Sequence, residues 1–278
     1  MAISSWPWRP ALAFLAAAAT VLALGMPADA STGTAQISPE QAGYTATGAQ
    51  FKTIHARVFL RQPTQYAGEV ASFGHSVQLW TSGLVVTMGV TASTSGSAYT
   101  PYATIYDRST HQVIASNPDA TYCEPDACVP VARTFFPGVS WTLTINYLPE
   151  VGQVVMFGFT DGGLWGFRSA YDLTAPSFTQ ARVGTEFGSS PWDASYPHTP
   201  PATSMKIAAY NNVSLTTYSG HSTTLWSWWV HHKLLANTGQ QSGSDWVAVP
   251  GDLSNGGASF QTFFVPQNAQ GSSPPAAP

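Results

Sequence analysis

The stretch Val139-Ser-Trp-Thr-Leu-Thr-Ile-Asn-Tyr147 decides the class of fold that this chain adopts. Every odd position holds a large apolar residue, and every even position holds a small polar one. Because successive side chains of a β-strand point to opposite faces, the alternation predicts an antiparallel strand with one buried face. The stretch from Lys52 to Leu60 repeats the pattern, with Ile54, Ala56, Val58 and Leu60 on one predicted face.

Further strands are predicted along the rest of the chain. Turn-forming clusters such as Asp161-Gly-Gly163 and Asn255-Gly-Gly257 separate them, and no window carries a convincing helical stripe. Ten or more strands in about 230 residues predict an all-β chain that forms a single-domain antiparallel β-sandwich or jelly roll. The other predicted strands span residues 77–92, 102–106, 111–116, 153–159, 164–169, 178–187, 205–218, 224–236 and 258–265.

The two ends of the chain differ in composition from the middle. Residues 1–30 resemble an export signal, with Arg9, an apolar run from Ala11 to Leu24, and a small-residue cleavage pattern at Ala28-Asp-Ala30. The apolar run is too short for a membrane span, which needs about 20 residues. We therefore expect a secreted, extracellular protein with no membrane segment after cleavage. The predicted parts are a signal peptide (1–30), an N-terminal extension (31–41), a β-sandwich domain (42–266) and a disordered tail (267–278).

Charge is scarce along the whole chain. Only 9% of the 278 residues are Asp, Glu, Lys or Arg, where about 25% is usual. Ten basic and fourteen acidic residues, scattered singly, form no basic stripe for nucleic acid. The high apolar and aromatic content argues against global disorder. Few native ion pairs can be lost on protonation, so we expect the fold to tolerate acid.

Cys123 and Cys128 are the only cysteines, and they close a short loop. In an exported protein this spacing predicts a disulfide. A zinc half-site is the rival interpretation, but no second His or Cys pair accompanies these residues, and we predict no metal.

Separately, Asn212-Val-Ser214 fits a glycosylation acceptor, which would matter only in a eukaryotic host.

The aromatic residues are a further candidate for ligand binding. Trp226 and Trp228 share one face of the strand predicted over 224–236. On an exposed face they would stack on sugar rings or hold peptide side chains. Packing in the core is the alternative for each of them.

Three stretches resemble a known family. Ala42-Gly-Tyr-Thr-Ala-Thr-Gly-Ala-Gln-Phe51 and Ile54-His-Ala-Arg-Val-Phe-Leu60 are similar to its opening strand pair, and Asp252-Leu-Ser-Asn-Gly-Gly-Ala-Ser-Phe260 to its closing strand. With the cysteine loop and a strand pair near 179–187 in the same order, the chain resembles the glutamic peptidases, or eqolisins, over roughly residues 40–265. The resemblance implies a lectin-like (concanavalin A-like) sandwich with a substrate groove on one curved sheet. It also implies an endopeptidase that acts at acid pH without metal or cofactor.

The family's chemistry uses a Glu as general base on a water and a Gln amide that holds the oxyanion. In the matching stretches, Thr87 stands at the Gln position and Arg182 at the first acidic position, while Glu186 keeps the second acidic position. Thr104 stands where a third strand usually carries an acid. A Thr hydroxyl has a shorter reach than a Gln amide, and Arg cannot accept a proton. The usual catalytic pair is therefore predicted not to be retained.

Glu186 remains as the candidate catalytic carboxylate. The sequence does not predict that Gln78 pairs with it. A two-residue shift of the alignment improves nothing, because Arg182 and Glu186 are four apart on one predicted face. The alternative is a groove or edge carboxylate beside Arg182. The predicted substrate-binding residues are Gln78, Thr104, Trp226 and Trp228.

We expect a secreted, eqolisin-like protein whose groove binds a peptide or protein. A catalytically degenerate relative is favoured over an active endopeptidase. A lectin-like protein that binds a polysaccharide or cell wall without catalysis is the alternative, and a purely structural or adhesive role is a third.

Overall fold

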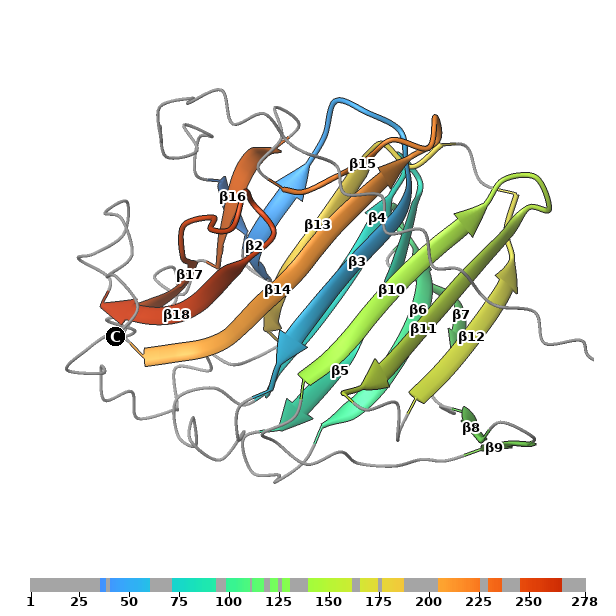
Figure 1. Cartoon of the computed structure of the whole chain (residues 1–278), viewed down its shortest axis with the longest axis horizontal. Helices are drawn as coiled ribbons and strands as arrows, with labels where there is room; N and C mark the ends of the chain where they lie inside the picture. Colours follow the sequence, from blue (N-terminus) through green and yellow to red (C-terminus); the bar gives the residue numbers. More distant parts are fainter. Residues whose placement is uncertain are drawn as a thin grey trace, which may run out of the picture.

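Every regular secondary-structure element that the computed structural model describes is a β-strand (Figure 1). No helix in this part of the chain has the length and hydropathy needed to cross a membrane. The described residues are 36–38, 41–60, 72–93, 99–110, 112–117, 121–124, 127–130, 140–161, 166–174, 177–187, 205–225, 230–236 and 246–266.

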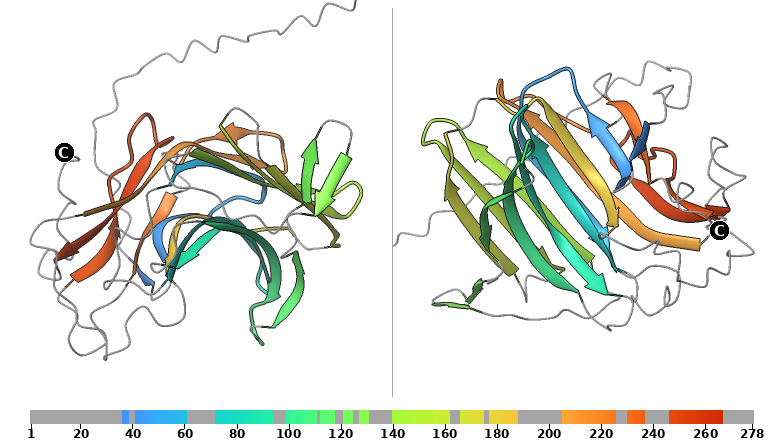
Figure 2. Two further views of the ribbon diagram at one scale, coloured as in Figure 1. Left: turned by 90° about the horizontal axis from the view of Figure 1, so that it is seen from below. Right: turned by 180° about the vertical axis from the view of Figure 1, so that it is seen from behind.

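The strands form two antiparallel layers that do not close into a barrel (Figure 2). The first layer has the order β12 (Gly166–Asp172), β11 (Gln153–Thr160), β10 (Ser140–Leu148), β3 (Phe51–Phe59), β14 (Met205–Thr217) and β18 (Phe260–Pro266). The second has the order β2 (Gln41–Ala46), β13 (Gln180–Phe187), β4 (Ser72–Trp80), β5 (Leu84–Ser93), β6 (Thr100–Asp107) and β7 (Val113–Asn117).

Hydrogen bonding continues from one layer to the other at one end of the sandwich. Strand β18 pairs with β17 (Trp246–Pro250), which pairs with β16 (Val230–Ala236), and β16 pairs with β2. Short β1 (Gln36–Ser38) runs parallel to β16, and β15 (Ser222–Thr223) pairs with β14. A separate hairpin consists of β8 (Thr121–Glu124) and β9 (Ala127–Pro130). The predicted all-β sandwich is thus confirmed.

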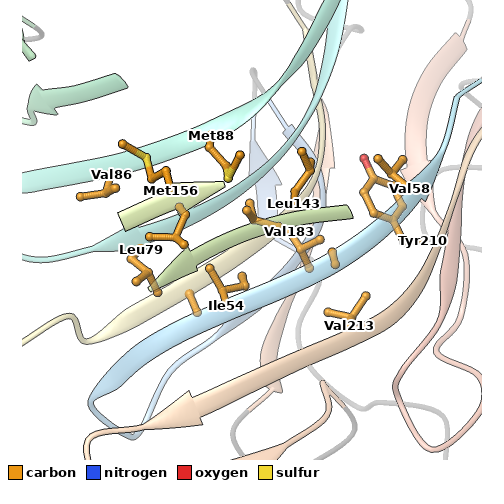
Figure 3. Close-up of a cluster of buried hydrophobic side chains, with 14 of the residues drawn as sticks. Ile54, Val58, Leu79, Val86, Met88, Leu143, Met156, Val183, Tyr210 and Val213 are labelled. Atoms are coloured by element: carbon orange, nitrogen blue, oxygen red, sulfur yellow. The ribbon is translucent and has the colours of Figure 1, made fainter. Parts of the chain in front are cut away.

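The core lies between the layers, where the alternating side chains of both meet (Figure 3). Within the stretch 139–147, the apolar side chains of Trp141, Leu143, Ile145 and Tyr147 are buried as predicted. The alternating apolar positions of β3 are buried as well. From the other layer Leu79, Val86, Met88 and Val183 complete the cluster drawn in Figure 3. Each large apolar side chain buried in this way stabilises the fold by about 1.5–3 kcal/mol.

The prediction of one strand over residues 77–92 was wrong. A turn at Thr81–Gly83 divides it into β4 and β5, which form a hairpin. The Thr81 hydroxyl accepts hydrogen bonds from the backbone N–H groups of Gly83 (3.1 Å) and Leu84 (2.8 Å), which fixes the turn. A threonine hydroxyl that bonds the backbone two or three residues ahead offers an alternative to the strand ladder. This hairpin determines the layout of the candidate site.

Two other predictions fall near the limits of the description. Cys123 and Cys128 are direct partners in the β8–β9 register, while their side chains lie outside the described residues, so the disulfide stays a prediction. Asn212 is exposed on β14, with a positive φ of 53° beside a register shift, and its glycosylation also remains a prediction.

Candidate functional site

The second layer curves, and its concave side faces away from the first layer (Figure 2, left). Because side chains alternate along each strand, every second residue of β4, β5, β6 and β13 points away from the core onto this side. We call these residues the concave face. Its members near the candidate site are Ser76, Gln78, Trp80, Val85, Thr87, Gly89, Tyr102, Thr104, Tyr106, Gln180, Arg182, Gly184 and Glu186.

Four of the predicted site residues lie side by side in one row across the concave face. Gln78 of β4 is the register partner of Arg182 on β13 and of Thr87 on β5. Thr87 is in turn the partner of Thr104 on β6. The structure therefore brings together residues that are up to about 100 positions apart in the sequence. Gln78 and Thr87 are almost completely buried, whereas Arg182 and Thr104 are half-buried.

Glu186 binds Gln78, contrary to the expectation that these two residues form no pair. The Gln78 side-chain amide donates to Glu186 Oε1, and the Ser76 hydroxyl donates to the same oxygen. The Tyr102 hydroxyl donates to the other carboxylate oxygen, Oε2, at 2.8 Å. A carboxylate held by three donors from two other strands, β4 and β6, has a fixed position, which is a requirement for a group that must meet a substrate.

Two glycines lie between the groups that converge on Glu186. Gly184 occupies the concave-face position between Arg182 and Glu186, opposite Ser76. Gly89 is the register partner of both Ser76 and Tyr102, and a Cβ there would lie 3.0 Å from the Tyr102 hydroxyl. With no side chain at either position, Glu186 and Tyr102 can extend toward each other across β4 and β5.

Trp80 fixes the orientation of the Gln78 amide. The indole Nε1–H donates to Gln78 Oε1 at 2.7 Å. An indole N–H can only donate, so the amide oxygen must face Trp80 and the amide NH₂ must face Glu186. The result is a directed chain of hydrogen bonds from Trp80 through Gln78 to the carboxylate.

Two arginines lie against the same indole. The guanidinium carbon of Arg182 is 3.8 Å from the Trp80 ring centre, and that of Arg108 is 4.9 Å from it. Both distances are within the range of cation–π attraction. Arg182 also donates to Gln180 Oε1 at 3.5 Å, and Arg108 donates to the backbone carbonyl of Thr81 at 3.2 Å.

Tyr102 is a neutral donor at acid and neutral pH. Burial of its hydroxyl and the nearby negative charge of Glu186 raise the pKa of Tyr102 well above 10. Sequence reasoning missed this residue, because its contact with Glu186 crosses two intervening strands, β4 and β5, and leaves no mark on the pattern of β6 itself.

A buried polar cluster lies behind the site, between the two layers. His75 and Thr185 occupy the core-facing positions next to Ser76 and Glu186. The His75 Nδ1 lies 3.2 Å from the Thr185 hydroxyl and 3.1 Å from the Tyr210 hydroxyl, within hydrogen-bonding distance of both. Burial lowers the pKa of His75 from 6.5 to about 3, so the ring is neutral near neutral pH.

The remaining predicted binding residues are not placed. Trp226 and Trp228 lie outside the described residues, so their stacking on a polysaccharide stays a prediction. Within the described ranges, no group of three or more His, Cys, Asp or Glu side chains is arranged to hold a metal ion.

Comparison with known proteins finds similarity in structure alone. No family model and no curated protein matches the sequence. A crystal structure of scytalido-glutamic peptidase with a transition state analog inhibitor matches with a TM-score of 0.53 and 13% identity, covering 82% of this chain and 99% of that one. The eqolisin SCP-B in complex with the tripeptide Ala-Ile-His matches with a TM-score of 0.47, 12% identity and the same coverage. At 13% identity the match to scytalido-glutamic peptidase shows a shared fold, which confirms the structural resemblance to glutamic peptidases.

Proposed function

We propose that this protein is an exported endopeptidase that acts at acid pH, with Glu186 as the general base and Gln78 as the oxyanion donor. The hydrogen bond between the Gln78 amide and the Glu186 carboxylate carries the proposal. This hydrogen bond joins a Gln and a Glu on the concave face, which are the two side-chain types that glutamic peptidases use to hydrolyse peptides. The export pattern of residues 1–30 and the scarcity of charge support the setting.

Each residue has a definite role in the proposed reaction. Glu186 takes a proton from a water molecule, whose oxygen then forms a bond to the peptide carbonyl carbon. The second N–H of Gln78, whose nitrogen lies at a long 3.4 Å from the Ser76 hydroxyl, stabilises the resulting oxyanion. The C–N bond then breaks, and Glu186 returns its proton to the leaving amine. A carboxylate suits this exchange at acid pH, where an amide donor does not titrate.

Thr87 and Arg182 take supporting positions in this proposal. They stand at the positions that the family resemblance assigns to the Gln and Glu, and they flank Gln78 in the same row. A threonine hydroxyl is a short donor, and an arginine stays protonated, so neither can act as the base. The shift of both roles to Gln78 and Glu186 is a departure from the family arrangement.

The test is cleavage of a denatured protein by the purified mature chain between about pH 2 and 5. We expect Glu186→Gln to lower the rate at least about 100-fold, the usual effect of losing a general base. Gln78→Leu should lower kcat by a similar factor, as expected for the loss of an oxyanion donor. Glu150→Gln, at an exposed position in the β10–β11 turn, is the matched control and should leave the rate unchanged.

Two results would overturn the proposal. Equal cleavage by the wild type and the Glu186→Gln variant would show that Glu186 is not the base. Binding of peptides without any cleavage would show that the protein is the catalytically degenerate relative that its sequence favours.

A further inference from the structure

We propose that Arg182 and Arg108, held on the Trp80 indole, form a subsite for an acidic side chain of the substrate peptide. This inference rests on the proposed peptide-binding function and adds a preference to it. It starts from the presence of two guanidinium groups at one aromatic ring, 3.8 and 4.9 Å from its centre.

The charge of this arrangement favours an anion. Guanidinium groups remain protonated at any pH relevant to the protein, so both cations persist in acid. Two like charges that share one ring repel each other, and an anion within reach of both reduces that repulsion. Stacking uses the faces of the guanidinium groups, whereas hydrogen bonds to a carboxylate use their N–H edges.

The nearby carboxylates are already bound to other groups. Glu186 accepts hydrogen bonds from Gln78, Ser76 and Tyr102. Asp107, which precedes Arg108, accepts from the backbone N–H groups of Ser109 (2.7 Å) and Thr110 (2.9 Å) and from the Ser109 hydroxyl (2.6 Å). These hydrogen bonds lower the pKa of Asp107 to about 2, and the bond from the Ser109 hydroxyl contributes most. Both carboxylates therefore accept hydrogen bonds from donors other than the two guanidinium groups.

The position of Trp80 relative to Gln78 places the subsite along the peptide. The two residues are alternate members of β4 and are joined by the Trp80 Nε1–H bond to Gln78 Oε1. Alternate residues of a strand are separated by about 6.6 Å, which is also the spacing of alternate side chains in an extended peptide. A peptide lying along β4 with its scissile bond at Gln78 thus presents the side chain two residues away to the arginines.

The test uses peptide pairs that differ only by Glu or Gln, placed in turn at each position within three residues of the scissile bond. At pH 5 we expect the Glu peptide to be cleaved with a kcat/KM about three- to fivefold higher at one of these positions, as for a half-exposed charge pair. The preference should vanish below about pH 3, where the peptide carboxyl is protonated. Both Arg182→Gln and Arg108→Gln should abolish it, while Arg168→Gln, an exposed arginine on β12, should retain it.

A purely structural role for the arginines gives a different result. If they only hold Trp80 in place, Arg182→Gln lowers kcat equally for both peptides at every pH. The subsite is also overturned if the wild type cleaves both peptides equally at every position tested.

A binding measurement separates this inference from the proposed catalysis. Calorimetry at pH 5 with the Glu186→Gln variant compares the affinities of the two peptides without cleavage. Tighter binding of the Glu peptide by this variant, together with a wild type that cleaves neither peptide, would retain the subsite and refute the peptidase. Equal affinity, or no binding of either peptide, would refute the subsite.

Discussion

Protonation of His75 is the step that we expect to limit this fold in acid. The side chain has no exposed surface, and its Nδ1 lies among the Thr185 and Tyr210 hydroxyls. The rings of Tyr99 and Tyr210 are beside it, with centres 5.8 and 6.0 Å from that of the imidazole. Burial lowers its pKa from 6.5 to about 3, because an imidazolium would lose its hydration there.

The sign and size of the effect follow from this shift. The unfolded chain binds a proton at His75 near pH 6.5, whereas the folded protein binds it only near pH 3. The contribution to stability is therefore fully present above pH 6.5 and is lost as the pH falls toward 3. Each pH unit corresponds to about 1.36 kcal/mol. The window of roughly 3.5 units thus amounts to about 5 kcal/mol, which the stability of the fold at pH 7 must exceed if the protein is to act in acid.

The assay is urea unfolding at pH 7, 5.5 and 4, followed by tryptophan fluorescence. A His75→Gln variant keeps a polar side chain but cannot titrate, so its free energy of unfolding should fall several kcal/mol less than that of the wild type over this range. His221→Gln, at an exposed turn position, is the control and should follow the wild type. A parallel loss of stability in the wild type and His75→Gln would refute the reasoning, whatever their difference at pH 7.

Three further variants test the site and its support. Trp80→Phe keeps an aromatic ring at this position but removes the donor to Gln78 Oε1, so we expect kcat to fall about tenfold while the Glu preference remains; an unchanged kcat would contradict the orienting role. Tyr102→Phe removes a donor to Glu186 Oε2, which should move the acid limb of the pH–rate profile to higher pH, and a shift to lower pH would count against the contact. Gly184→Ala places a Cβ 2.4 Å from the backbone oxygen of Ala42, and thermal unfolding should show at least about 2 kcal/mol of lost stability, unlike Gly83→Ala in the open turn.

The strand pattern of this chain could be predicted because each buried face repeats every second residue. Residues 140–147 lie in β10 and residues 52–59 lie in β3, with the expected side chains in the core. Such a pattern depends only on neighbours along the chain, so one sequence is enough to reveal it. The two-layer sandwich follows from the number of such strands.

The candidate site could not be predicted in the same way, because one turn was missed. If residues 77–92 formed a single strand, Gln78 and Thr87 would be nine positions apart and would point to opposite faces. The turn at Thr81–Gly83 makes them register partners on the same face. The turn consists of only three residues between two long apolar runs. The two runs were therefore read as one continuous strand, and the hairpin was missed. The contact of Glu186 with Tyr102 depends on that same hairpin, since it crosses β4 and β5.

The order of strands also has a consequence for how the chain reaches its native state. Strand β3, near the start, lies between β10 and β14, and β2 lies between β13 and β16. Neither early strand can form these pairings until partner strands 80 to 190 residues later in the sequence have been synthesised. Pairings this distant in sequence slow folding into the range of milliseconds to seconds. A nascent chain that ends before Met205 lacks β14 to β18, so we expect it to remain unfolded until β18 has been synthesised.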